Sequence, residues 1–417
     1  MSGLTVVEIC AGAGGQALGL ERAGFDHALA VEIDPNAART LRHNRDWKVA
    51  VGDVADRSVW NPADFEGVDL LAGGVPCPPF SIAGKQLGAL DERDLFAWAV
   101  ELLPVVKPRA LLLENVRGLA TKRFAGYREH VLDRLEELGY RAAWRLMQAS
   151  DYGVPQLRPR FVLVALLADE ADAFRWPEPT PTMMTVGSVL HDYMAAGGWR
   201  HADAWSRNAN RVAPTIVGGS KRHGGADLGP TRAKAAWAAL GVDGKGIADS
   251  APPRQAVKGH VPRLTIEMVA RLQGWTAADD WTFTGLKTSR YRQVGNAFPP
   301  PVAEIVGTAI RSVLLRDRPL AAMAVSQSIS VSRDPVYSML KATDGYVPLS
   351  RLVEAAGPGA EVSVTMGRIQ EISLDFVVDV RESQEGPEFR LAGFRGFVGQ
   401  DDHVRHDFLA DKRSRVS

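Results

Sequence analysis

An apolar run at residues 68–72 constrains the fold of this chain more than any other feature. The run is too short for a typical helix and is largely apolar without alternation, as in a strand buried on both faces of a parallel sheet. It leads to Cys77, which is flanked by prolines. Ligands of open α/β sheets bind outside the carboxyl ends of the strands, so Cys77 would lie at a ligand site. We predict a catalytic nucleophile here, and a buried structural thiol is the alternative.

Other short apolar runs along the first part of the chain alternate with segments of helical periodicity. The runs that we expect to form further strands are residues 4–9, 28–31, 47–51, 109–113, 142–146 and 161–166. The segments that we expect to form helices are residues 18–23, 91–106 and 124–138. This alternation predicts an α/β fold with a mostly parallel sheet.

A glycine-rich turn at residues 10–15 separates the first expected strand from the first helix. Glycines let the backbone approach a ligand closely and leave the helix N-terminus facing it. Glu32 follows the second strand, about 20 residues on, where a carboxylate can accept both hydroxyl groups of a ribose. Asp53 follows the third strand, where it could accept from the amine of an adenine ring. The pattern predicts an adenosyl site, and solvated loop residues are the alternative for both acids.

Composition limits the class of protein. The chain has 417 residues, 46% of them hydrophobic, which is enough for two or three domains with a large core. Its two cysteines exclude a disulfide framework and favour a reducing compartment such as the cytoplasm. The formal net charge is zero, so any basic surface for a nucleic acid must be local. No signal peptide, membrane span or metal site is expected.

Charged residues also stand at the ends of later strands. Glu114 follows the strand at 109–113 and is a candidate general acid, although a charge at the start of the next element would look the same. Arg158 and Arg160 precede the strand at 161–166 and must meet anions or carbonyl groups if they are buried. The segment at 81–88 is polar and contains glycine, so we expect a mobile loop beside Cys77.

The order of these motifs resembles that of the cytosine-5 DNA methyltransferases of bacterial restriction–modification systems. The matching motifs are residues 8–15, 74–81, 114–116, 156–160, 264–275 and 290–297, with a closing helix at 301–315. The joint order is far more specific than any single motif and covers roughly the first three quarters of the chain. The resemblance implies a doubly wound, Rossmann-like catalytic domain interrupted by a small target-recognition domain.

The resemblance also implies a reaction and a methyl donor, S-adenosylmethionine. Cys77 would add to carbon 6 of a flipped-out cytosine while Glu114 hydrogen-bonds to or protonates ring nitrogen 3, so that carbon 5 can accept the methyl group. Arg160 would hold the carbonyl oxygen of the base. Arg158 and Gln156 would brace the loop.

By the same resemblance, the donor would contact residues from the strand ends and from the last motif. These are Cys10, Ala11, Gly12, Ala13, Gly14, Gly15, Glu32, Ile33, Asp53, Val54, Pro76, Leu95, Asn296 and Ala297. Two positions depart from the family pattern. Cys10 replaces a common phenylalanine, which would thin the contact with adenine, and Pro78 replaces a common glutamine.

Double-stranded DNA is the implied partner, and residues 177–262 are the implied recognition region. The residues expected to contact DNA are Ser81, Lys85, Gln86, Arg93, Lys221, Arg222 and Arg232. Apart from 231–240, this region has little helical or strand periodicity, and a solvated glycine-rich loop is the alternative for 218–225. We expect a monomer that shares its DNA site with a restriction endonuclease without a stable complex.

The expected domains are a catalytic domain at 1–176, the recognition region at 177–262, the last motifs at 263–318 and an appendage at 319–417. In the appendage we expect helices at 335–341 and 349–356, and strands within 361–380. This order is compatible with a winged-helix module or with an interaction module that does not touch DNA. A transfer-RNA cytosine-5 methyltransferase and a non-catalytic DNA-binding relative remain the alternative functions for the chain.

Overall fold

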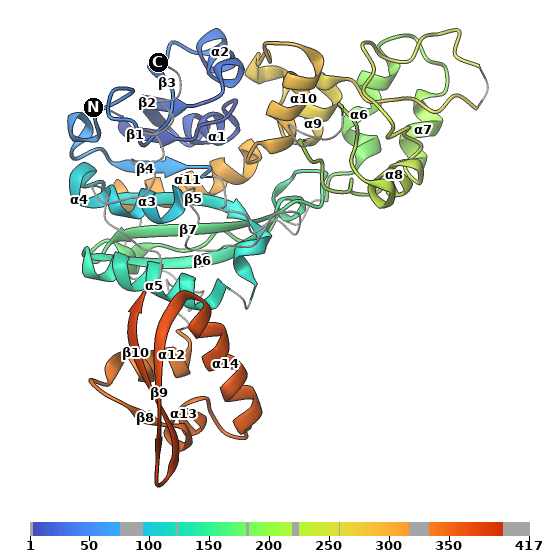
Figure 1. Cartoon of the computed structure of the whole chain (residues 1–417). Helices are drawn as coiled ribbons and strands as arrows, with labels where there is room; N and C mark the ends of the chain where they lie inside the picture. Colours follow the sequence, from blue (N-terminus) through green and yellow to red (C-terminus); the bar gives the residue numbers. More distant parts are fainter. Residues whose placement is uncertain are drawn as a thin grey trace, which may run out of the picture.

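The computed structural model describes residues 3–75, 95–121, 124–180, 183–218, 225–257, 259–316 and 333–394. A large sheet with helices on both faces forms the centre of the molecule (Figure 1). A group of helices projects from one end of this sheet, and a small module hangs below it.

The central sheet has seven strands in the order β3-β2-β1-β4-β5-β7-β6. The strands are β1 (Leu4–Ile9), β2 (Phe25–Glu32), β3 (Val49–Val51), β4 (Leu70–Gly73), β5 (Ala110–Val116), β6 (Tyr140–Gln148) and β7 (Pro159–Leu167). Strands β1 to β5 pair in parallel, whereas β7 is antiparallel to both β5 and β6. The predicted α/β class is confirmed, and every strand predicted within residues 4–166 overlaps an observed one.

The order of strands reverses direction between β1 and β4, which is where doubly wound sheets bind ligands. Ile9 at the end of β1 lies opposite Gly73 at the end of β4, and Gly73 lies opposite Leu113 on β5. The carboxyl ends of these three strands therefore meet at one edge, and the residues that follow them are neighbours in space.

Helices cover the two faces of the sheet. The helices of this domain are α1 (Gly15–Arg22), α2 (Pro35–Asn44), α3 (Leu95–Glu101), α4 (Leu103–Val106), α5 (Ala125–Glu137) and α11 (Pro300–Leu314). The helix predicted at 91–106 is therefore two short helices in its described part.

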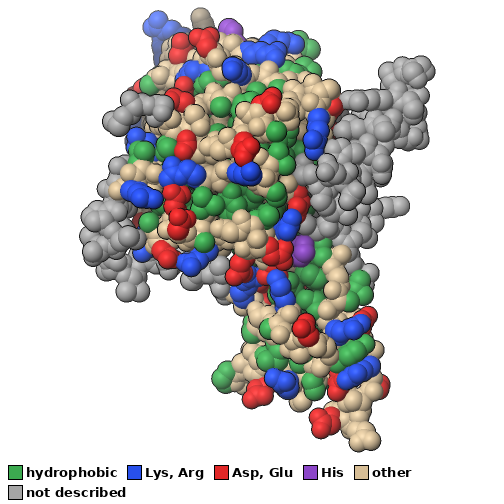
Figure 2. Space-filling view, turned by 90° about the vertical axis from the view of Figure 1, so that its left-hand side faces the viewer, with side chains coloured by type: hydrophobic (Ala, Val, Ile, Leu, Met, Phe, Trp, Pro, Cys, Tyr) green, Lys and Arg blue, Asp and Glu red, His purple; other side chains and the backbone are tan. Residues whose placement is uncertain are grey.

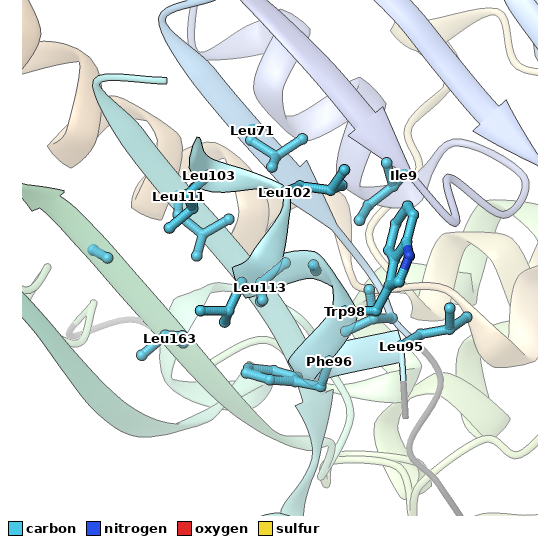
Figure 3. Close-up of a cluster of buried hydrophobic side chains, with 14 of the residues drawn as sticks. Ile9, Leu71, Leu95, Phe96, Trp98, Leu102, Leu103, Leu111, Leu113 and Leu163 are labelled. Carbon is cyan, nitrogen blue, oxygen red and sulfur yellow. The ribbon is translucent and has the colours of Figure 1, made fainter. Parts of the chain in front are cut away.

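Alternate residues of each strand enter separate cores, as the period of two along a strand requires. Ile9 and Leu113 pack on one face with Phe96 and Trp98 of α3 (Figure 3). Val6 packs on the other face with Leu20 of α1 and residues of α11. Both faces of the central strands are buried, which explains why their sequences are almost wholly apolar.

The region at 177–262 contains more helix than the sequence suggested. Its helices are α6 (Val186–Ala195), α7 (Ala202–Asn208) and α8 (Thr231–Ala238), and the last motifs form α9 (Ile266–Leu272) and α10 (Lys287–Asn296). The prediction of little periodic structure is wrong for α6 and α7. Helix α7 has only seven residues, too few for a clear period, and Trp205 and Leu190 bury these helices against each other and α9.

The C-terminal module contains α12 (Pro335–Ala342), β8 (Val347–Pro348), α13 (Leu349–Ala355), α14 (Val362–Asp375), β9 (Phe376–Ser383) and β10 (Gly386–Phe394). Its three strands form an antiparallel sheet in the order β8-β10-β9.

The prediction of strands within 361–380 is wrong for residues 362–375, which are helical. The segment begins with alternating residues, Val362 to Met366, which imitate a strand. The side chains that are buried are instead Thr365, Ile369 and Ile372, at the spacing of a helix.

Helix α5 carries the module at a narrow waist. Figure 2 shows acidic and basic side chains gathered at this junction. Asp133 of α5 accepts from the Tyr337 hydroxyl at 2.5 Å and from Lys341 Nζ at 2.7 Å, and it also pairs with Arg333. The backbone amide of Tyr127 donates to Asp375 Oδ2 at 2.8 Å. The module is therefore fixed to the domain of the central sheet by polar contacts to buried side chains of α5 and α14.

No helix within the described ranges is long and apolar enough to cross a bilayer. The same ranges contain no group of three histidine, cysteine or acidic side chains placed to hold a metal ion.

Candidate functional site

A cavity of about 1410 Å³ opens at the carboxyl ends of β1, β2, β4 and β5. Most of the predicted site residues that the structure describes lie in its wall. They are Cys10, Ala11, Gly12, Ala13, Gly15, Glu32, Ile33, Asp53, Val54, Leu95, Glu114, Arg158, Arg160, Asn296 and Ala297. The cavity thus brings together strand ends that are far apart in the sequence.

Other predicted residues lie elsewhere. Gly14 is absent from the cavity wall and instead has φ of +88°, with the Trp281 ring beside it. Arg232 lies exposed on α8, away from the cavity. The residues outside the described ranges are Pro76, Cys77, Ser81, Lys85, Gln86, Arg93, Lys221 and Arg222.

The glycine turn is held open by Glu32. The backbone amide of Gly12 donates to Glu32 Oε2 at 2.7 Å, and that of Asp34 donates to Glu32 Oε1 at 2.7 Å. Cys10 and Gly12 have positive φ angles, +53° and +56°. Burial raises the pKa of the Glu32 carboxyl, and the two amide donors oppose that rise. The carboxylate therefore shapes the turn and still presents lone pairs to the cavity.

The strand-end acids fit an adenosyl group. Asp53 lines the same cavity as Glu32, and one of its oxygens accepts from the backbone amide of Ala55 at 3.0 Å. Close backbone packing behind the turn limits the space there, because a side-chain carbon on Gly15 would lie 2.3 Å from the carbonyl oxygen of Phe298. Glu32 and Asp53 can accept hydrogen bonds from the ribose hydroxyls and from the adenine amine, and both lie beside the glycine turn. These are the acceptors that a nucleoside requires.

Glu114 and Arg160 form a buried ion pair at the end of β5. Arg160 lies opposite Val116 across the antiparallel β5–β7 pair, so its guanidinium reaches the Glu114 carboxylate. Each residue is 8% exposed. Burial raises the pKa of Glu114, while the nearby positive charges of Arg160 and Arg158 oppose the rise. The site therefore holds a carboxyl group that retains a proton more readily than an exposed glutamic acid does.

Arg158 is buried and uses its guanidinium to join separate segments. It donates to the carbonyl oxygens of Ile216 at 2.6 Å, Gly295 at 2.8 Å and Ala297 at 2.9 Å. Gln156 accepts from the backbone amide of Ile216 at 2.8 Å. These contacts attach Ile216 and residues 295–297 to the segment that leads into β7. Arg158 therefore lines the cavity, but its hydrogen bonds to these carbonyl groups hold separate segments of the chain together.

Several cavity residues were missed by sequence reasoning. Gln16 follows the glycine turn and lies in the first turn of α1. Asn115, next to Glu114, donates from Nδ2 to the carbonyl oxygen of Val75 at 3.4 Å and so anchors the segment that leads to Cys77. The position of Gln16 after the glycines was the available signal, whereas Thr215 and Arg292 of the cavity wall enter only through tertiary packing.

Comparisons with known proteins agree with this geometry. A model of the family described as C-5 cytosine-specific DNA methylase matches residues 4–312. The type II methyltransferase M.NaeI of Lentzea aerocolonigenes is 57% identical over 419 residues, covering 100% of this chain and 100% of the relative. M.NgoMIV of Neisseria gonorrhoeae is 49% identical over 318 residues, covering 75% of this chain and 99% of the relative.

Solved structures share the fold of the larger part of the chain. A DNMT2 mutant from Spodoptera frugiperda has a TM-score of 0.52 at 16% identity, covering 73% of this chain and 99% of that chain. Dnmt2 from S. pombe has a TM-score of 0.50 at 20% identity, covering 75% of this chain and 99% of that chain.

Proposed function

The chain belongs to the C-5 cytosine-specific DNA methylase family, and from this premise we propose that it modifies one short duplex sequence through a covalent adduct of Cys77. It transfers a methyl group from S-adenosylmethionine to carbon 5 of cytosine in DNA. The observation that carries the proposal is the buried Glu114–Arg160 pair, which stands beside the end of β4, the strand that leads to Cys77.

The chemistry starts from a weakness of cytosine, since its carbon 5 is too poor a nucleophile to take a methyl group unaided. The Cys77 thiolate forms a covalent bond to carbon 6, while the Glu114 carboxyl protonates or hydrogen-bonds to nitrogen 3. Together these interactions place electron density on carbon 5. S-adenosylmethionine would supply its sulfonium-activated methyl group to carbon 5 and leave as S-adenosylhomocysteine. Carbon 5 then loses its proton to a base, and the electrons of that bond expel the thiolate from carbon 6.

Arg160 has two functions in this scheme. It fixes the Glu114 carboxyl through one oxygen, and its remaining N–H groups can donate to the carbonyl oxygen of the base. The base must leave the duplex to reach these groups, which costs a few kcal/mol of unstacking that contacts in the cavity recover.

Bisulfite sequencing of plasmid DNA from cells that express the chain tests the activity and its specificity together. We expect protected cytosines within one short motif, and no protection with Cys77→Ser. Glu136→Ala is the control, because its exposed side chain lies outside the cavity wall and the variant should keep protection. If a folded chain that binds the donor protects no cytosine, duplex DNA is not its substrate, and transfer RNA becomes the substrate to assay.

Two substitutions divide chemistry from donor binding. Cys77→Ala should abolish methyl transfer but leave the affinity for S-adenosylhomocysteine unchanged. Asp53→Ala should chiefly weaken that affinity, because Asp53 lies in the cavity wall and its carboxylate would accept from the amine of adenine. Equal loss of affinity in both variants, measured by calorimetric titration, would contradict this division of labour.

We further propose that residues 177–262 recognise the DNA sequence and that Arg232 on α8 contacts the DNA backbone. Ser81, Lys85, Gln86, Arg93, Lys221 and Arg222 keep the DNA-contacting roles expected from their motifs. Arg232→Ala should lower DNA affinity in a salt-dependent manner without changing the methylated motif, since a phosphate contact positions DNA but does not identify bases.

We propose that the appendage at 319–417 contains a winged-helix-like module, residues 333–394, that takes part in interactions other than DNA binding. The order α12, β8, α13, α14, β9, β10 is that of a winged helix. Residues 333–394 contain six lysines and arginines but ten aspartates and glutamates, an excess of negative charge that disfavours contact with phosphates. Reversing the exposed Arg351 of α13 to glutamate should leave DNA affinity unchanged.

We propose that the chain acts as a monomer in the cytoplasm. A restriction endonuclease specific for the same sequence would be its functional partner, and the two would meet the DNA separately. Size-exclusion chromatography with light scattering tests the monomer, and cleavage of modified and unmodified plasmid by the nuclease tests the shared site.

A further inference from the structure

Gln16 presents an unused amide group to the cavity. The residue is 3% exposed, it lies in the first turn of α1, and it lines the cavity. Within the described part of the chain, neither its Oε1 nor its Nε2 has a hydrogen-bond partner. A buried amide without a partner is unfavourable, so such a group in the wall of a ligand cavity indicates that the ligand completes it.

The space that faces Gln16 is left open by Gly74. A side-chain carbon on Gly74 would lie 3.6 Å from Glu114 Oε2, 3.7 Å from the carbonyl oxygen of Cys10 and 3.8 Å from Gln16 Oε1. Three oxygen atoms from three different elements therefore surround one space. The other oxygen of Glu114 is paired with Arg160.

These three atoms are hydrogen-bond acceptors, or can act as such. A carbonyl oxygen and an amide oxygen only accept, and a carboxylate oxygen accepts when it is ionised. A hydrogen-bond acceptor of the ligand would be repelled here, whereas a nitrogen with two or three N–H groups would satisfy them together. The chemistry of the space is thus that of an amine site.

We propose that Gln16 Oε1, Glu114 Oε2 and the Cys10 carbonyl form an amine-binding corner of the cavity, in which Gln16 is a binding residue. This inference rests on the proposed function, because it requires that both the methyl donor and the target base occupy this cavity. Two groups in the reaction carry suitable N–H donors. They are the α-ammonium group in the methionine part of the donor and the exocyclic amine of cytosine.

The test compares Gln16→Leu with the native chain and with Gln148→Leu. Leucine keeps the approximate size of the side chain but removes the amide. Gln148 provides the matched control, since its Oε1 is also buried without a partner in the described residues but it does not line the cavity. Thermal unfolding establishes that each variant is folded.

The first arm measures calorimetric affinity for S-adenosylhomocysteine and for its analogue without the α-amino group. If the corner binds the ammonium, the native chain should prefer the amino form, and Gln16→Leu should weaken its binding by about 10- to 100-fold while leaving the analogue unaffected. This readout needs no turnover, so it remains informative if Cys77 is not the nucleophile.

The second arm uses a duplex of the mapped sequence with cytosine or uracil at the target position, and measures single-turnover methyl transfer. Uracil has a carbonyl oxygen where cytosine has its amine. If the corner binds the exocyclic amine, Gln16→Leu should slow transfer to cytosine by about 3- to 10-fold and reduce the preference for cytosine over uracil.

A change in either arm supports the corner and identifies the amine. The proposal is overturned if folded Gln16→Leu matches the native chain in both arms, or if Gln148→Leu shows the same losses. Gly74→Ala provides an independent check. Its added carbon would make only ordinary contacts at 3.6 to 3.8 Å and should fold, yet it should lower the affinity or rate that Gln16→Leu lowers.

Discussion

Asp133 provides the sharpest test of how the C-terminal module is attached. It is 4% exposed on α5 and contacts three residues of the module through its two carboxylate oxygens. Its partners are the hydroxyl of Tyr337, which is 2% exposed, and the side chains of Arg333 and Lys341, which are 24% and 43% exposed. Asp133→Ala removes all three contacts at once.

The magnitude follows from the burial of each partner. The Tyr337 hydroxyl would lose its acceptor, which costs about 1–3 kcal/mol for a buried polar group. Arg333 and Lys341 can regain water, so their ion pairs contribute about 1 kcal/mol or less each. The attachment of the module should therefore weaken by about 1–5 kcal/mol. For a unit of about 60–100 residues, 1 kcal/mol lowers the melting temperature by about 4–8 °C, so we expect a shift of at least about 4 °C.

Differential scanning calorimetry and limited proteolysis measure this effect. Asp133→Ala should show an early transition and release a C-terminal fragment, while methyl transfer at 25 °C stays near the native rate because Asp133 is outside the cavity wall. Glu136→Ala is the matched control. Glu136 pairs only with Arg333 among the described residues, at 2.6 Å, and its side chain is 71% exposed, so its loss should have little effect. The reasoning fails if Asp133→Ala melts like the native chain or if Glu136→Ala is equally damaging.

Three further predictions concern other parts of the chain. Burial lowers the pKa of His130 from its ordinary 6.5 to about 4, so the unfolded chain takes up a proton first as the pH falls. The free energy of unfolding by urea should therefore decrease by about 3 kcal/mol between pH 6.5 and 4, and His130→Phe should remove this decrease. Gly218→Ala would place a carbon 2.0 Å from Asn296 Oδ1 and should weaken calorimetric binding of S-adenosylhomocysteine, whereas Gly225→Ala, with nothing within 4 Å, should not. Arg158→Met leaves three carbonyl groups without their donor and should lower stability to urea by about 3–5 kcal/mol; an unchanged midpoint would contradict the bracing role.

Much of the catalytic domain could be predicted because its signals are local. The run at 68–72 is apolar because β4 is covered on both faces, and Leu70 and Leu71 are both fully buried. Glu32 is the last residue of β2 and Glu114 lies two residues before the end of β5, so the alternation of strands and helices along the chain was enough to place them near one edge of a parallel sheet.

Local signals failed where packing between distant segments decides the structure. Helix α14 begins with an alternating pattern that suits a strand, yet burial of Ile369 and Ile372 makes it helical. Arg158 was expected to brace a loop, but no local pattern identified its three acceptors, which come from segments 58 or more positions away in the sequence.

By itself, then, the sequence determined the order of strands and helices in the catalytic domain, the chemical groups at the strand ends and the class of reaction. Short stretches of sequence encode these features through hydrophobic periodicity and motif residues. Only the tertiary structure decided that Gln16 faces the cavity without a partner, that Arg160 holds Glu114 and that Asp133 carries the C-terminal module. Each of these depends on which side chains meet across the fold, and no local sequence pattern predicts a contact between residues that are far apart in the chain.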